Sequence, residues 1–251
     1  MLCFDGVGAA YRGSPVLENV SFSVAAGEMT ALLGRNGVGK TTLLRCLGGE
    51  KRDYTGKIFL DGENVRDLDR ARLARCLTCL PQNLPVPHVT VAELVAFGRA
   101  PYLPLLGKLR AEDREKVDWA LESVGMTVHS GSFVDTLSGG QRKKVFLAMT
   151  LAQDTPVVVL DEPTAHLDTA SRFEILELID RLCGKTGKTF LVVMHDLPEV
   201  LRYAHRAVVL HEGQVAFNGT PWDCLASGIP ERCFGITLTG DKENGFAVKP
   251  L

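Results

Sequence analysis

The chain has 251 residues, 45% of them hydrophobic and 23% charged, which is typical of a globular protein with one large α/β domain. Its formal net charge of −2 excludes the basic footprint of a nucleic-acid-binding protein. We expect no signal peptide and no transmembrane helix, because the first residues lack a basic flank and no run of about 18 apolar residues occurs. Seven irregularly spaced cysteines indicate reduced cytosolic thiols.

The N-terminal part of the chain predicts two kinds of strand. Residues 20–24 alternate between apolar residues and serines, which indicates a half-buried strand. Residues 58–60 repeat this alternation and end at an Asp61-Gly62 turn pair. Residues 30–33 instead form a short, mainly apolar run. We therefore expect antiparallel hairpins together with one apolar strand in residues 1–70.

Later segments are typical of a parallel α/β sheet. Residues 157–160 and 190–194 are continuous apolar runs, which indicates strands that are covered on both faces. Residues 208–217 predict a hairpin across Glu212-Gly213. Between about 86 and 155 no strand is obvious, and we expect this region to be helical. Apolar residues recur at helical spacing in two further segments, at Val117, Leu121 and Val124 and at Phe173, Leu176, Ile179 and Cys183.

Three capping boxes mark expected helix starts. Each pairs a short polar side chain with Glu or Gln three residues later. Pro198 also occupies a position that suits the first turn of a helix. The three pairs are Thr90 with Glu93, Ser138 with Gln141, and Asp196 with Glu199.

A glycine-rich segment after the apolar strand fits the P-loop pattern G-x-x-x-x-G-K-[ST]. Its glycines allow backbone N–H groups to approach phosphate oxygens, and the following helix adds partial positive charge at its N-terminus. Lys40 is expected to reach the β- and γ-phosphates of ATP, and the Thr41 hydroxyl to ligate Mg²⁺. The predicted cradle consists of Gly34, Arg35, Asn36, Gly37, Val38, Gly39, Lys40, Thr41 and Thr42.

The apolar strand at 157–160 ends in two carboxylates. A P-loop requires a second metal-holding carboxylate on a neighbouring strand, and Asp161 is the candidate Mg²⁺ ligand. Glu162 is placed to polarise the water that attacks the γ-phosphate. An acidic pair at a strand end is ordinary by itself, so this interpretation depends on the P-loop.

The run Leu137-Ser138-Gly139-Gly140-Gln141 resembles the signature motif of the ABC ATPase family. Ser138 is expected to cap a helix whose first turn carries two glycines, so that its bare N–H groups form an anion site. In the family this site, here Ser138, Gly139, Gly140 and Gln141, binds the γ-phosphate held by the P-loop of another subunit. The resemblance therefore implies a head-to-tail dimer of two copies with two composite ATP sites.

Other elements of the chain resemble the same family in order, from residue 1 to about 237. Tyr11 resembles the aromatic residue that stacks on adenine, although a tyrosine on a strand surface is the alternative. Gln82 resembles the Q-loop glutamine that contacts Mg²⁺ and water, and residues 165–168 resemble the D-loop with Asp168 at the dimer seam. His195 resembles the switch histidine that contacts the γ-phosphate.

Departures from the family pattern are small. Arg35 stands where many relatives have Pro, and Lys144 where many have Arg. Neither position supplies an essential group, so ATP hydrolysis remains the expected activity.

The segment 90–103 suggests a subgroup. Its T-V-x-E-L-V-x-x-G-R-x-P-aromatic run resembles ATPase subunits that drive import of ferric siderophores, haem and vitamin B12. Residues 105–113 and 146–156 extend the likeness toward the ATPase subunits of ferric-dicitrate importers. An amphipathic surface helix at 91–97 is the plainer interpretation, and both are compatible.

The resemblance implies a P-loop NTPase with a RecA-like core of mostly parallel sheet, an antiparallel β subdomain and an inserted helical subdomain. We expect an ATPase domain over 1–237, with the helical subdomain at about 86–155, and a tail over 238–251 without an assignable role. The implied partners are a second copy, two transmembrane permease subunits and, indirectly, an extracytoplasmic substrate-binding protein.

The implied location is the cytoplasmic face of the plasma (inner) membrane, where the chain would be peripheral. A soluble ABC ATPase of DNA repair or translation is one alternative, and a motor for a bare metal ion or an exporter is another. An ordinary P-loop kinase or GTPase would lack the signature motif. The transported chelate, the permease and the transport stoichiometry are not encoded legibly in this chain.

Overall fold

The computed structural model describes residues 1–104, 107–241 and 245–250, and its contacts divide the chain into two units. The first unit comprises Met1–Leu68 and Leu191–Leu251, and the second comprises Asp69–Phe190. Leu105 and Leu106, within the predicted helical subdomain, lie outside the described residues. The same holds for residues 242–244 and 251 of the predicted tail.

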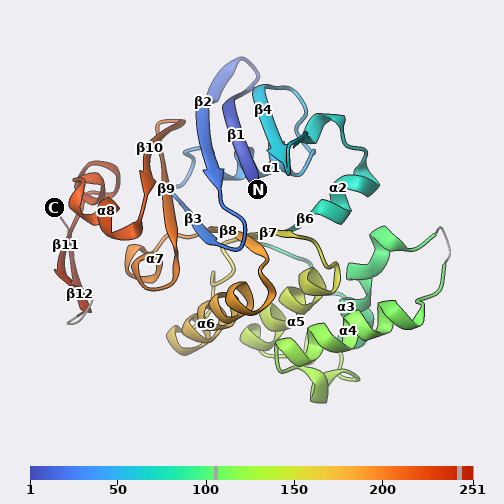
Figure 1. The fold of residues 1–251 in the computed structure, drawn as a ribbon. Coiled ribbons are helices and arrows are strands. Elements are labelled where there is room, and N and C mark those ends of the chain that lie inside the picture. Colours follow the sequence, from blue (N-terminus) through green and yellow to red (C-terminus); the bar gives the residue numbers. More distant parts are fainter. Residues whose placement is uncertain (105–106, 242–244, 251) are drawn as a thin grey trace. The chain divides into compact units, whose positions relative to one another are not determined.

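An antiparallel sheet, blue to cyan in Figure 1, forms one part of the first unit. Its strand order is β2-β1-β4-β5. Along β2 the residues Val20, Phe22 and Val24 are buried between exposed serines, which confirms the predicted alternation. The strands are β1 (Leu2–Tyr11), β2 (Ser14–Val24), β4 (Tyr54–Leu60) and β5 (Glu63–Asn64).

A second group of strands in the first unit contains the predicted apolar strand. All five residues of β3 (Met29–Leu33) are buried, and β3 pairs in parallel with β9 (Arg206–His211). β9 pairs antiparallel with β10 (Gln214–Gly219), which confirms the predicted hairpin. Its turn residues Glu212 and Gly213 have φ values of 49° and 76°, as a type I′ turn requires.

The remaining elements of the first unit are short. Part of the predicted tail forms a two-stranded hairpin of β11 and β12. The elements are α1 (Lys40–Leu47), a 3₁₀ turn at Val65–Asp67, α7 (Leu197–Tyr203), α8 (Pro221–Ala226), a π-helical turn at Pro230–Phe234, β11 (Ile236–Asp241) and β12 (Gly245–Pro250).

The second unit is mainly helical. β6 (Leu77–Leu80) and β7 (Val157–Asp161) pair in parallel, and β8 (Thr189–Val193) begins in this unit and ends in the first. Figure 1 shows α3, α4 and α5 packed together. The helices are α2 (Arg70–Cys76), α3 (Val91–Ala96), α4 (Ala111–Ser123), α5 (Gly139–Ala152) and α6 (Thr169–Thr186), with 3₁₀ turns at Phe97–Tyr102, Thr127–His129 and Val134–Thr136.

The predicted helical region contains no strand among its described residues 86–104 and 107–155, apart from an isolated bridge between Thr90 and Phe133. The domain boundaries given above remain predictions. Across the parts of the chain that the structure describes, no helix has the length and apolarity needed to cross a bilayer.

Two of the three predicted capping boxes form. Thr90 caps α3 with Glu93 returning its bond, and Ser138 caps α5 with Gln141 in the same way. The prediction for Asp196 is wrong in detail, because Asp196 occupies the N-cap of α7 without a side-chain capping bond, although Pro198 does lie in the first turn.

The helix predicted from the spacing of Phe173, Leu176, Ile179 and Cys183 is confirmed, because all four residues lie in α6. Leu176, Ile179 and Cys183 are buried, whereas Phe173, near the start of the helix, is 39% exposed.

The Gly98-Arg99 pair of the subgroup motif has a structural explanation. A Cβ atom at Gly98 would collide with the backbone carbonyl of Met149, so only glycine allows this turn to approach α5. The Arg99 guanidinium is buried, donates to Asp113 Oδ1 at 2.9 Å and to Ala152 O at 2.7 Å, and lies 4.0 Å from the centroid of the Tyr102 ring. Arg99 therefore ties this segment to α4 and α5.

The Asp113 carboxylate is the buried counter-charge in this arrangement. Burial raises its pKa, but the Arg110 backbone N–H and the Arg99 guanidinium outweigh this effect, so the pKa lies below its usual value. A buried charge that loses its partner is strongly destabilising.

We predict that Arg99→Met lowers the free energy of unfolding by about 3–5 kcal/mol, because it leaves the buried Asp113 carboxylate without its cationic partner. Urea unfolding followed by circular dichroism measures this change. Arg114→Met, at an exposed position of α4, is the control and should change stability by less than about 0.5 kcal/mol. Equal stability of the Arg99→Met and Arg114→Met variants would contradict the assignment.

Candidate functional site

The glycine-rich loop joins β3 to α1 in the first unit. Lys40 begins α1, and its ammonium donates to the backbone carbonyls of Gly34 at 2.6 Å and Arg35 at 3.1 Å. The side chain is only 6% exposed, so the loop wraps closely around it. A cation at a helix N-terminus, within a loop of backbone amides, is suited to binding an anion such as a phosphate.

Glycine is required at two places in this loop. Gly39 caps α1 with φ 109°, and a Cβ atom there would lie 2.5 Å from Leu17 Cδ2. Gly34 has φ 151°, and a Cβ atom would lie 2.6 Å from the Leu210 carbonyl oxygen. The backbone path of the loop therefore excludes side chains at these positions.

The other predicted residues of the first unit lie on neighbouring segments. Thr41 is exposed and Thr42 is buried in the first turn of α1. Tyr11, at the end of β1, is 41% exposed, and the Lys51 ammonium lies 4.6 Å from its ring centroid. His195 lies two residues after the end of β8. Asn36, Gly37 and Val38 complete the loop.

In the second unit, the register of β6 and β7 brings Gln82 to Glu162. Leu80 lies opposite Leu160, so the residues that follow both strands leave the sheet at the same edge. The Gln82 amide donates to Glu162 Oε2 at 2.7 Å, and Asp161 ends β7 beside them. Glu162 has φ 50°, an unusual conformation for a non-glycine residue and one that is frequent at functional sites.

The signature segment forms a tightly capped helix start. Ser138 Oγ accepts from the Gln141 N–H at 3.3 Å, and the Ser138 N–H donates to Gln141 Oε1 at 3.0 Å. Gly139 and Gly140 form the first turn of α5, where added Cβ atoms would meet Leu167 at 3.6 Å and Ser171 at 3.1 Å. The four predicted signature residues thus lie together at one helix N-terminus.

Asp168 fixes the start of the next helix. Its carboxylate accepts from the Ser171 N–H at 3.0 Å and from the Ser171 hydroxyl at 2.7 Å. These hydrogen bonds lower the pKa of Asp168, chiefly through the backbone N–H. Asp168 therefore fixes the start of α6 directly after the segment 165–167.

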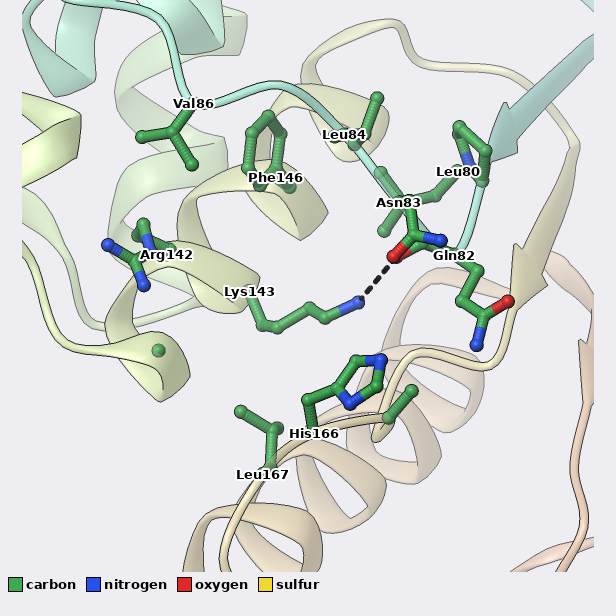
Figure 2. Close-up of a pocket in the computed structure, with 13 residues that line it drawn as sticks. Leu80, Gln82, Asn83, Leu84, Val86, Arg142, Lys143, Phe146, His166 and Leu167 are labelled. Atoms are coloured by element: carbon green, nitrogen blue, oxygen red, sulfur yellow. Dashed lines mark hydrogen bonds between the residues drawn. The ribbon is translucent and has the colours of Figure 1, made fainter.

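Sequence reasoning missed Lys143, which the structure places beside Gln82. The residues around Gln82 (the Q-loop, 80–84), α5 and the 165–167 segment line a cavity with a volume of about 240 Å³. Figure 2 shows the side chains that surround it. Across it the Lys143 ammonium donates to the Gln82 backbone carbonyl at 3.2 Å. Burial lowers the pKa of Lys143, against the opposing effect of the Glu162 and Asp161 carboxylates. The sequence signal for an inward-facing Lys143 is its position three residues before Phe146, an apolar residue that the structure buries on the same helix.

In the second unit, the Asp161 carboxylate and the Gln82 amide oxygen are donor types that suit a hard divalent cation such as Mg²⁺. The third predicted ligand, the Thr41 hydroxyl, lies in the first unit. The Gln82 amide nitrogen bonds Glu162, so its oxygen has no part in that bond. Among the described residues no cluster of three His, Cys, Asp or Glu side chains offers an alternative metal site.

Comparisons with known proteins agree with this geometry. The profile of the family described as "ABC transporter" matches residues 17–165. The chain is 37% identical to the iron(3+)-hydroxamate import ATP-binding protein FhuC of Bacillus subtilis (strain 168), over 94% of this chain and 88% of the relative. It is 40% identical to the ferric enterobactin transport ATP-binding protein FepC of Escherichia coli (strain K12), over 90% of this chain and 84% of the relative.

Solved structures give the same result for the fold. An ABC transporter in an inward-facing conformation matches with a TM-score of 0.85 and 25% identity, covering 100% of this chain and 97% of the other. The ATP-binding cassette MJ0796, a dimer with ADP and phosphate, matches with a TM-score of 0.74 and 27% identity, covering 88% and 99%. The P-loop, the acidic strand end and the signature helix therefore have a common explanation: the chain belongs to the ABC transporter family, as one of its ATP-binding subunits.

Proposed function

We propose that this chain is the ATP-hydrolysing subunit that powers import of an iron chelate, such as a siderophore, ferric citrate, haem or a corrinoid, through a membrane permease. One observation carries the choice of cargo class: FhuC and FepC, which by name serve ferric hydroxamates and ferric enterobactin, match this chain along most of its length. The narrower likeness to ferric-dicitrate ATPase subunits stays a prediction.

The proposed ATP contacts begin in the first unit. Backbone N–H groups of residues 34–42 would surround the β- and γ-phosphates, and the Lys40 ammonium would leave the loop carbonyls to bind them. Tyr11 would stack on adenine, and the Lys51 cation near its ring would fix the ring's position.

Hydrolysis is proposed to use the edge at which β6 and β7 end. Glu162 would accept a proton from the attacking water, and the Gln82 amide holds its carboxylate in place. His195 would contact the γ-phosphate. Thr41, Asp161 and Gln82 would hold Mg²⁺, which when bound neutralises phosphate charge.

The signature helix is proposed to act on a second copy. The N-terminus of α5, with Ser138, Gly139, Gly140 and Gln141, would bind the γ-phosphate held by the P-loop of the other subunit, and Asp168 would lie at the seam. The dimeric cassette with ADP and phosphate supports this arrangement. ATP would close the dimer and hydrolysis would reopen it.

The proposed partners are two transmembrane permease subunits, with the chain bound peripherally at the cytoplasmic face of the plasma (inner) membrane. An extracytoplasmic substrate-binding protein would deliver the chelate from the other side. The Q-loop and the helices near 83–110 are the segments expected to transmit movement to the permease.

A pull-down from native membranes tests the transport role. Tagged Glu162→Gln protein, held closed with ATP, should recover a many-helix permease that mass spectrometry identifies. The binding protein that accompanies this permease can then be titrated with ferric chelates, haem and corrinoids. Recovery of ribosomal or DNA-associated proteins without an integral membrane protein would refute the transport role, and binding of none of these ligands would refute the cargo class.

We predict that Glu162→Gln lowers kcat for ATP hydrolysis by about 10²–10⁴-fold, because the amide cannot accept the water's proton. Phosphate release by the purified full-length chain measures kcat. Glu115→Gln on the exposed face of α4 is the charge-matched control and should leave kcat unchanged. Near-normal turnover by Glu162→Gln would remove Glu162 from the role of base.

We predict that Lys40→Ala weakens ATP binding by at least about tenfold, since a hydrogen bond to a charged group contributes roughly 1.5–3 kcal/mol. Titration with a fluorescent ATP analogue measures the Kd. Lys57→Ala, which removes an exposed lysine of β4, is the control and should bind ATP normally. Unchanged affinity in a folded Lys40→Ala variant would contradict the proposed cradle.

A further inference from the structure

Lys143 is a cation that the proposed chemistry does not yet use. It lies on α5, two residues after Gln141, and its half-buried side chain reaches the end of β6 (Figure 2). Its ammonium donates to the backbone carbonyl of Gln82 at 3.2 Å, while the side-chain amide of Gln82 donates to Glu162 at 2.7 Å. Gln82 is thus held between Lys143 and Glu162.

The surroundings of Lys143 are partly desolvated and electrostatically directed. Burial lowers the pKa of its ammonium, and the nearby carboxylates of Glu162 and Asp161 act in the opposite sense. Charges interact more strongly in such a place than at a water-exposed surface. The Lys143 ammonium therefore interacts electrostatically with both carboxylates and also donates a hydrogen bond to the backbone carbonyl of Gln82.

The neighbouring lysine shows that this placement is specific. Lys144 has the same length and charge but leaves α5 in another direction, where its ammonium bonds Glu174 on α6 at 2.8 Å. Of these two lysines it is Lys143 that bonds Gln82, so Lys144 provides a matched control.

The end of the Lys143 side chain borders a cavity. The space of about 240 Å³ is bordered by Leu84, Phe146 and Leu167 among others, so the end of the Lys143 side chain is not enclosed in a close-packed core. Hydrogen bonding and charge hold the ammonium there. Loss of the ammonium with the stem retained, as in Lys143→Met, should therefore leave the fold intact.

We propose that Lys143 is a positioning residue for ATP hydrolysis, which holds the Gln82 carbonyl and so keeps the Gln82 amide on Glu162. This inference rests on the proposed role of Glu162 as the base. Since Lys143 lies on the helix that Ser138 starts, a shift of the signature helix would move Gln82. Binding of the γ-phosphate at the start of α5 would in this way be linked to the position of the Glu162 carboxylate.

Steady-state ATP hydrolysis by the full-length chain tests this proposal. Lys143→Met should lower kcat about tenfold, the scale of one charge-assisted hydrogen bond, and change the KM for ATP less than about twofold. Lys143→Arg should restore kcat to within about threefold of the parent, because it returns the donor and the charge. Lys144→Met should hydrolyse ATP normally. The melting temperature of each variant serves as the check on folding.

A double-variant cycle separates positioning from an independent effect. If Lys143 acts through Gln82, Lys143→Met should cost little further activity in a Gln82→Ala background. If the fold-losses in kcat of the two single variants multiply in the double variant, the proposal is overturned. Failure of Lys143→Arg to restore kcat would also overturn it. Normal turnover by Lys143→Met, with Glu162→Gln inactive, would refute the role of Lys143 alone. Normal turnover by Glu162→Gln would refute the base itself and the present inference with it.

Discussion

The parallel register of β6 against β7 is the constraint on which the proposed catalytic chemistry depends. Because Leu80 lies opposite Leu160, the chain leaves both strands at one edge and Gln82 meets Glu162. Both strands are largely buried, apart from Cys79 and Asp161, so their packing fixes this edge. A glutamate in a left-handed conformation, with its carboxylate held by an amide, is suited to the role of a pre-organised base that we propose for Glu162.

The second theme of the molecule is the helix N-terminus, which we propose as an anion site in each unit. The first unit presents α1 behind the glycine-rich loop, and the second presents α5 behind Ser138. The two ends differ in design. Lys40 adds a buried cation to the first, whereas the second is closed by a capping box and presents glycines in its first turn. This difference suits one site that grips phosphates and another that docks on them from a second copy.

Much of the fold and of the candidate site could be predicted from the sequence because local chemistry determines it. The buried strand at 30–33, the Glu212-Gly213 turn and the caps at Thr90 and Ser138 follow from residue type and spacing. Contacts between distant segments could not be predicted in this way. Nothing in the spacing of Lys143 and Lys144 says which of them reaches Gln82, since α5 must first pack on β6 and α6. The capping bond expected from Asp196 does not form, although Asp196 is the N-cap of α7 as its position predicts.

The subgroup motif also combines a pattern that is legible in the sequence with contacts that only the structure shows. Gly98, Arg99 and Tyr102 belong to a segment that resembles iron-chelate importers. The contacts that the structure shows for Arg99 are nevertheless within the second unit, with Asp113, Tyr102 and the end of α5. A motif that identifies relatives can therefore act by holding a helical layer in shape, with its exposed neighbours, such as Phe97, left to meet a partner.

Sedimentation velocity of the full-length Glu162→Gln protein tests most directly the claim that ATP is bound between the P-loop of one copy and the signature helix of another. The account predicts a dimer with saturating Mg²⁺-ATP, a monomer with ADP, and a monomer in both cases once Ser138→Arg blocks the start of α5. A species that stays monomeric with bound ATP, or a dimer that is indifferent to nucleotide and to Ser138→Arg, would contradict it.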